Sequence, residues 1–147
     1  MDMETNVLTE TDFHQWALDT AQAIREHRFD GVDWEQVAEE IESLAKSERR
    51  ELKSHLAQLM YHLLKSELQP YRRGASWEIT LSNQRKEISD LLLGQPSLKP
   101  CLRDGAFLES AYVRAQLLAA KEIEDALFWT NVPKNCPYTL EMLLPDL

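Results

Sequence analysis

The sequence has few residues of several kinds that other protein classes need. Its 147 residues include 4 glycines and 2 cysteines. So few glycines disfavour a fold built on β-hairpins, whose tight turns depend on glycine. Two cysteines, Cys101 and Cys136, are too few for a disulfide scaffold and indicate a reducing compartment. No apolar run approaches the roughly 20 residues that cross a membrane, so the sequence predicts no membrane span.

Basic residues are also scarce. The chain holds 16 lysines and arginines against 25 acidic residues, a formal charge of −9. Such a balance disfavours nucleic acid and anionic membranes as partners. The first residues, "MDMETNVLTETD", lack the charged-then-apolar order of a signal peptide. We therefore expect a soluble cytoplasmic protein, with residues 1–8 extended or disordered and residues 9–147 in one helical domain.

Helical periodicity runs through almost the whole chain. A first helix is expected to begin near Thr9 or Thr11, because Thr9 and Asp12 have the spacing of a capping box. It should end near Phe29, where Gly31 supplies a break.

One long helix is predicted from Asp33 to Glu67, with Asp33 and Gln36 as reciprocal caps. At 100° per residue its apolar side chains all fall within roughly 60° of one line. A break near Ser47 is the alternative, and Pro70 ends the helix in both cases. The apolar line consists of Trp34, Val37, Ala38, Ile41, Ala45, Leu52, Leu56, Leu59 and Leu63.

Further caps divide the rest of the chain. Ser76 is expected to cap a third helix, and Ser97 a fourth one from Leu98 to about Ile123, with Pro100 in its first turn. That fourth helix is rich in alanine and glycine, which let a neighbouring backbone approach closely. Thr139 should cap a short C-terminal helix. The sequence thus predicts an all-α bundle of about four main helices around one long central helix.

Three blocks of the sequence resemble a bacterial family of uncharacterised proteins, the domain of unknown function number twenty-nine. The blocks are "EEIESLAKSERREL", "SWEITLSNQRKEISDLL" and "CPYTLEMLL", and the likeness covers nearly the whole chain. The family pattern has a glycine and an aromatic residue where this chain has Ala45 and Ser66. The resemblance implies an all-α fold and no particular reaction.

Ionisable residues recur along the long helix. Glu48, His55 and His62 are seven residues apart and form a slowly turning line at the flank of the apolar face. A lone carboxylate near that face is costly, so we expect Glu48 to have a partner, with Gln84 and Arg85 as candidates. We interpret these five residues as a buried polar cluster that fixes helix register.

A metal site on this line is the less favoured alternative. His55 and His62 are separated by about 10.5 Å of helix rise, too far to share one ion. Glu51 and His55 lie four residues apart and could share one. The sequence has no H-E-x-x-H and no E-x-x-H element, and we predict no metal or other cofactor.

The stretch "RRELKSH" contains the R-x4-H pattern of HEPN-like ribonucleases in Arg50 and His55. Both side chains would have to meet at one phosphate. On a continuous helix they point about 140° apart, so they converge only if the helix begins between them or a second subunit contributes. The pair is the leading catalytic alternative.

The loop "QPYRRGASW" is the best candidate for a surface site. Arg72 and Arg73 precede an expected helix N-terminus, and Tyr71 and Trp77 flank them. A phosphate or an acidic partner segment could bind there. A solvated turn is the simpler reading of the same residues.

Taken together, these patterns favour a small interaction or structural protein without catalysis, which binds a protein partner or a second copy of itself. A ribonuclease that uses Arg50 and His55 is the first alternative. A metal-dependent hydrolase that uses Glu51 and His55 is the second.

Overall fold

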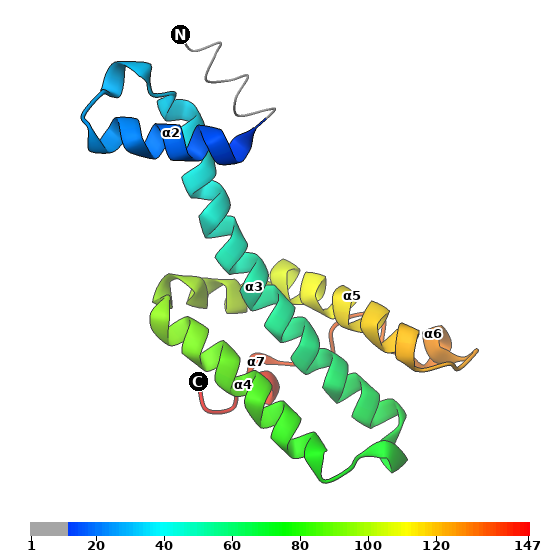
Figure 1. Ribbon diagram of the computed structural model, residues 1–147. Helices are drawn as coiled ribbons and strands as arrows, with labels where there is room; N and C mark the ends of the chain where they lie inside the picture. The colour runs from blue at the N-terminus through cyan, green and yellow to red at the C-terminus, as the bar shows by residue number, and fades with distance from the viewer. Residues whose placement is uncertain (1–11) are drawn as a thin grey trace. The chain divides into compact units, whose positions relative to one another are not determined.

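A computed structural model describes residues 12–147 of the chain (Figure 1). The N-terminus expected to be extended or disordered over residues 1–8 and the capping box expected at Thr9 lie outside this range. Residues 12–147 form α-helices, 3-10 helices and connections, and contain no strand. The fold class predicted from the helical periodicity is therefore confirmed.

The chain divides into two compact units, Met1–Lys46 and Ser47–Leu147. We call them unit 1 and unit 2. The boundary falls inside the longest helix, so each unit contains part of it. The single domain expected over residues 9–147 stays a prediction.

Unit 1 begins with α2, Phe13–Arg25, whose N-terminus is capped by Asp12. The helix ends before the expected Phe29. His27 adopts a left-handed φ of 60°, the amide of Arg28 donates to the carbonyl of Ala23 at 2.8 Å, and that of His27 donates to Ile24. These bonds form the αL helix cap that glycine usually provides. The break is therefore made by His27, and Gly31 has no positive φ.

The helix α3, Trp34–Leu68, is continuous through Ser47, as its unbroken apolar phase predicts. It follows the short 3-10 helix η1, Phe29–Gly31. Asp33 caps it by accepting a hydrogen bond from the amide of Gln36 at 3.1 Å. The reciprocal half of the expected capping box is missing, because the Gln36 side chain donates instead to Glu40, at 2.7 Å.

The connection after α3 contains η2, Pro70–Arg72, and leads into α4, Ser76–Gly94. Ser76 does not cap α4. It is the first helical residue, and Ala75 stands at the cap position in helical conformation without a side-chain bond. The cap expected at Ser76 is therefore wrong by one residue, and the first amides of α4 receive no side-chain acceptor from it.

The fourth helix expected from Leu98 is wrong in its first part. Residues Pro96–Arg103 form the 3-10 helix η3, and Asp104, with extended backbone, caps α5, Gly105–Glu122. Pro100 lies inside η3 rather than in the first turn of an α-helix.

The C-terminal part contains two one-turn helices. Phe128–Asn131 forms α6, which the sequence did not predict, and Leu140–Leu143 forms α7. Thr139 caps α7 as expected, by accepting from the amide of Met142 at 3.3 Å.

The core of unit 2 forms around the second half of α3, which lies between α4 and α5 (Figure 1). Leu56 and Met60 of α3 are fully buried there. Ala111, Ala115 and Ala119 of α5 are also fully buried, whereas Gly105 and Ala106 at its start are exposed.

Candidate functional site

The first third of α3 carries a row of apolar side chains, which we call the α3 stripe: the exposed Trp34, Ile41 and Leu44, and the half-buried Val37. They fall within about 80° of one another around an ideal helix. Trp34, Ile41 and Leu44 are 50%, 61% and 68% exposed. Contiguous exposed apolar surface of this kind is typical of interaction sites.

The same helical phase is fully buried in unit 2, where Leu52, Leu56 and Leu59 have no exposed surface. Both parts of α3 therefore carry an apolar face of the kind that lines a hydrophobic core. Only the part in unit 2 has that face covered by the helices of its own unit. The phase of a helix identifies its apolar face without saying what covers that face.

Aromatic residues of the preceding segment extend the exposed surface of unit 1. The ring of Phe29 lies 6.0 Å from that of Trp34, and Phe29 is 45% exposed. In α2, Phe13 and Leu18 are about half exposed, whereas Trp16 is buried. Unit 1 thus presents more apolar surface than the α3 stripe alone.

The formal charge of the chain belongs to unit 1. Residues 1–46 contain twelve acidic and three basic residues, a formal charge of −9, whereas residues 47–147 contain thirteen of each. Around an ideal helix, Glu40 lies about 80° from the centre of the α3 stripe on one side, and Glu42 and Glu35 lie about 120° and 140° from it on the other. The stripe is therefore an apolar surface with acidic edges.

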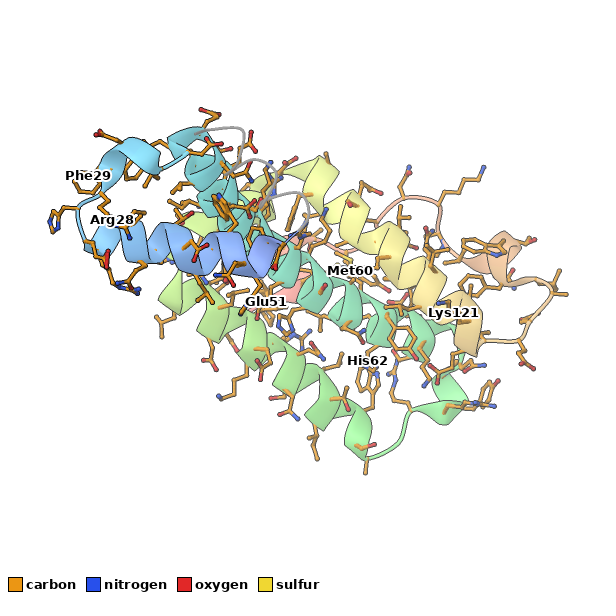
Figure 2. The ribbon with its side chains drawn as sticks, turned by 45° about the horizontal axis from the view of Figure 1, so that its top comes forward. Arg28, Phe29, Glu51, Met60, His62 and Lys121 are labelled. Carbon is orange, nitrogen blue, oxygen red and sulfur yellow. The ribbon has the colours of Figure 1, made fainter. Side chains whose placement is uncertain are left out.

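A second candidate lies in unit 2, where the end of α3, η2 and the start of α4 enclose a cavity of about 200 Å³. We call it the α3–α4 pocket. Figure 2 shows His62 on the side of α3 that faces α4. The residues that line the pocket are His62, Lys65, Ser66, Gln69, Arg72, Arg73, Gly74, Ser76, Trp77 and Thr80.

Arg73 is held in this pocket by two neighbours. Its guanidinium carbon lies 4.4 Å from the centre of the Trp77 ring, a cation–π contact. Its Nη2 donates to the buried hydroxyl of Ser66 at 3.1 Å. The small side chain of Ser66 supplies that acceptor.

Two further ionisable groups complete the pocket wall. Lys65 forms an ion pair with Glu122 of α5. Burial, with a smaller contribution from the nearby Lys65 ammonium, lowers the pKa of the His62 imidazole. His62 is therefore neutral at pH 7, and the permanent charges of the pocket come from lysine and arginine.

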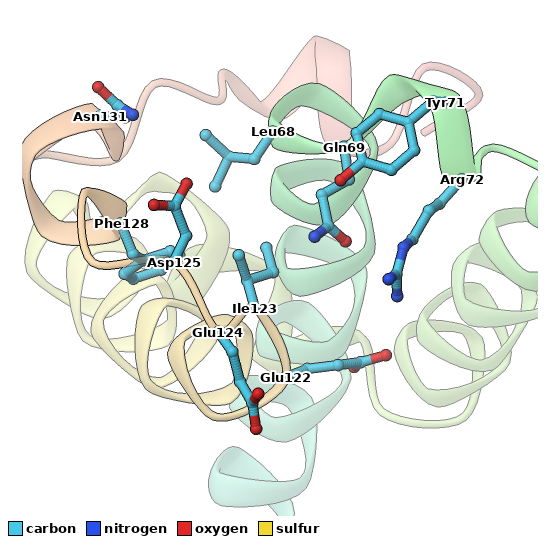
Figure 3. Close-up of a pocket in the computed structure, with 10 residues that line it drawn as sticks. All are labelled: Leu68, Gln69, Tyr71, Arg72, Glu122, Ile123, Glu124, Asp125, Phe128 and Asn131. Atoms are coloured by element: carbon cyan, nitrogen blue, oxygen red, sulfur yellow. The ribbon is translucent and has the colours of Figure 1, made fainter.

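A neighbouring cavity of about 490 Å³ lies on the other side of Gln69 and Arg72 (Figure 3). Its wall includes the carboxylates of Glu122, Glu124 and Asp125. Figure 3 shows the Arg72 side chain extending from its loop on the side of the cavity where Glu122 lies. Tyr71 lines this second cavity and is 78% exposed, so the four residues singled out in "QPYRRGASW" are divided between two cavities.

The structure does not bring the expected polar cluster together. Glu48 accepts a hydrogen bond from the Gln95 side chain at 2.7 Å, rather than from Gln84 or Arg85. His55 lies beside Glu51, and His62 lies in the α3–α4 pocket. The spacing of seven residues spreads these groups along a continuous helix, so each finds a different partner.

Arg85 has a partner that sequence reasoning missed. Its Nε donates to the carbonyl of Leu143 at 2.8 Å and its Nη2 to that of Met142 at 3.0 Å. These contacts join residues nearly sixty positions apart. The sequence carries no signal for them, because backbone carbonyls are present at every position.

The two catalytic alternatives have only part of their geometry. Because α3 is continuous, Arg50 and His55 point about 140° apart, as expected for an unbroken helix. Nε2 of His55 lies 3.8 Å from a carboxylate oxygen of Glu51. Among residues 12–147, no group of three or more histidine, cysteine, aspartate or glutamate residues is placed to hold a metal ion.

Comparison with known proteins identifies the family. The model of the family described as a domain of unknown function, DUF29, matches residues 8–146. The chain belongs to the DUF29 family. No curated protein and no solved structure matches this DUF29 chain. Among its described helices, none combines the length and the apolar character that crossing a bilayer requires.

Proposed function

We propose that this protein is an interaction module without catalysis of its own, and that unit 1 binds an amphipathic helix of a basic partner protein. The observation that carries the proposal is the exposure of Trp34, Ile41 and Leu44 on one face of a well-formed helix. Burying one such side chain contributes roughly 1.5–3 kcal/mol. A partner that covers several of them gains enough free energy for stable binding.

The form of the α3 stripe supports a helical partner. Its members recur every three or four residues, which is the spacing that an amphipathic helix meets when it packs lengthwise. The partner would place apolar residues against Trp34 and Ile41, as in a two-stranded coiled coil. Charged residues at its flanking positions would then lie close to Glu35, Glu40 and Glu42.

The charge of unit 1 supports a basic partner over a second copy of the chain. Two copies of this region would bring a formal charge of −9 against −9. Like charges across an interface oppose association, whereas lysine and arginine opposite these glutamates would speed and strengthen it. We place the interaction in the cytoplasm, in keeping with the two unpaired thiols of Cys101 and Cys136.

The test uses two synthetic helical peptides of about 20 residues. Both carry leucine and isoleucine on one face, and they differ only in having lysine or glutamate at the flanking positions. The change in the tryptophan fluorescence of the full chain, to which Trp34 contributes, measures binding on titration. We expect the lysine peptide to bind and the glutamate peptide not to bind. Equal binding of both would remove the charge argument.

Two matched variants locate the surface. Ile41→Glu should weaken binding of the lysine peptide by about 10- to 100-fold, because it places a charge in the apolar contact. Leu93→Glu adds the same charge at a leucine of α4 that is 82% exposed, and should leave binding unchanged. If the chain elutes as a dimer that Ile41→Glu dissociates, and neither peptide binds, the occupant is a second copy and the proposal is wrong.

A further inference from the structure

We propose that the α3–α4 pocket of unit 2 is a binding site for a small phosphate monoester. This site is separate from the surface of unit 1, so it goes beyond the proposed function. The cavity of about 200 Å³ has room for a phosphate group and a small organic part.

The first support is the charge of the wall. Lys65, Arg72 and Arg73 line the pocket, and no carboxylate does. Unit 2 as a whole has equal numbers of acidic and basic residues. Lys65 is paired with Glu122, so Arg72 and Arg73 are the cations at this cavity without an acidic partner among the described residues, and an anion is the ligand that they match.

The second support is that one of the cations is already held in place. Arg73 is stacked on Trp77, and its Nη2 is bonded to the buried Ser66 hydroxyl. Its orientation is thus fixed by groups that leave most of its five N–H donors free for a ligand. A guanidinium whose orientation is already fixed loses little side-chain entropy when it binds an oxyanion.

The third support separates a phosphate monoester from a bare anion. Gln69 lines both this pocket and the neighbouring cavity, and its Oε1 atom is buried without a hydrogen-bond donor among the described residues. A buried acceptor without a donor is costly, and a hydroxyl of the ligand would supply one. The pocket wall also offers the Ser76 and Thr80 hydroxyls and the Trp77 ring. Together these groups suit a phosphorylated hydroxy compound better than a simple ion.

The experiment is isothermal titration of the full chain with two probes, inorganic phosphate and ribose 5-phosphate. We expect saturable one-to-one binding of ribose 5-phosphate, tighter than that of inorganic phosphate. Arg72→Gln should weaken it by about 10-fold or more, because a charged hydrogen bond is lost. Arg72 is an exposed residue, so thermal unfolding of this variant should match that of the parent chain.

Lys99→Gln is the matched control, since it removes one exposed lysine of η3 outside the pocket. It should change the affinity by less than about 2-fold. Equal weakening by both variants would mean that the anion responds only to net charge, and would overturn the proposal. No saturable binding of either probe, or binding of a phosphoserine peptide without binding of ribose 5-phosphate, would also overturn it. None of these outcomes bears on peptide binding by unit 1.

Discussion

Unit 1 and unit 2 use the same helix in opposite ways. In unit 2 the apolar face of α3 is packed against α4 and α5, and acidic and basic residues are equal in number. In unit 1 the same face is exposed from Trp34 to Leu44, and acidic residues outnumber basic ones four to one. Net charge keeps an exposed apolar face soluble and discourages its contact with other copies. The difference shows that one helical phase is covered by core packing in unit 2 and left exposed at Trp34, Ile41 and Leu44 in unit 1.

The largest expected effect tests this difference directly. Leu56→Ala should lower the free energy of unfolding by about 2–5 kcal/mol, because Leu56 is fully buried and its loss leaves a cavity. Ile41→Ala, on the same helix, should change it by less than about 0.5 kcal/mol, since Ile41 is 61% exposed. Urea denaturation measures both values. Similar losses in the two variants would show that the α3 stripe is part of a core.

Deprotonation of tyrosine at alkaline pH should lower the stability of unit 2 and not that of unit 1, because all four tyrosines lie in unit 2. Burial raises the pKa of Tyr112 to about 12, and it raises the pKa of Tyr138 as well. The unfolded chain therefore loses these protons first. Ionisation of Tyr112 should leave the free energy of unfolding unchanged below pH 10. Between pH 10 and 12 it should lower that free energy by at most about 1.4 kcal/mol per pH unit.

The control for the alkaline titration is Tyr112→Phe. This variant loses the hydrogen bond from the phenol to the carbonyl of Pro133, at 2.6 Å, and should be less stable at neutral pH. It should also show a shallower fall above pH 10 in chemical denaturation. A slope identical to that of the parent chain would mean that Tyr112 does not carry the effect.

The smallest expected effect concerns the stability of α2 in unit 1. His27 occupies a left-handed conformation that costs a non-glycine residue roughly 1 kcal/mol. His27→Gly should therefore be more stable than His27→Ala by about that amount, since both lack the imidazole and only alanine keeps the strain. Hydrogen exchange of the α2 amides measures the difference locally. Equal exchange in the two variants would contradict the assigned cause.

Periodicity alone was enough to predict the all-α fold and the continuity of α3, because the phase of Trp34 to Leu63 never changes. It was insufficient where a single side chain decides the backbone. His27 ends α2 in a conformation that glycine favours, and Asp104 rather than Ser97 caps α5. Local propensity is a weak guide at such positions, since several residues can serve as caps.

The candidate sites were predictable only in part. The loop after α3 was identified from Arg72 and Arg73, but His62 and Lys65 come from the helix before it and join them only in the folded chain. The bond from Gln95 to Glu48 spans 47 positions. Whether an apolar face is covered also depends on tertiary packing, so the exposure of Ile41 could not be inferred from a pattern that it shares with Leu59.

The contact of Arg85 with the carbonyls of Leu143 and Met142 recognises main chain and no side chain. Substitutions at Met142, which is half exposed, can therefore accumulate without loosening the last helix. Arg85 is harder to replace, because the single ammonium group of lysine cannot reproduce the planar guanidinium that donates to both carbonyl oxygens. Substitutions should therefore be tolerated more readily at Met142 and Leu143 than at Arg85.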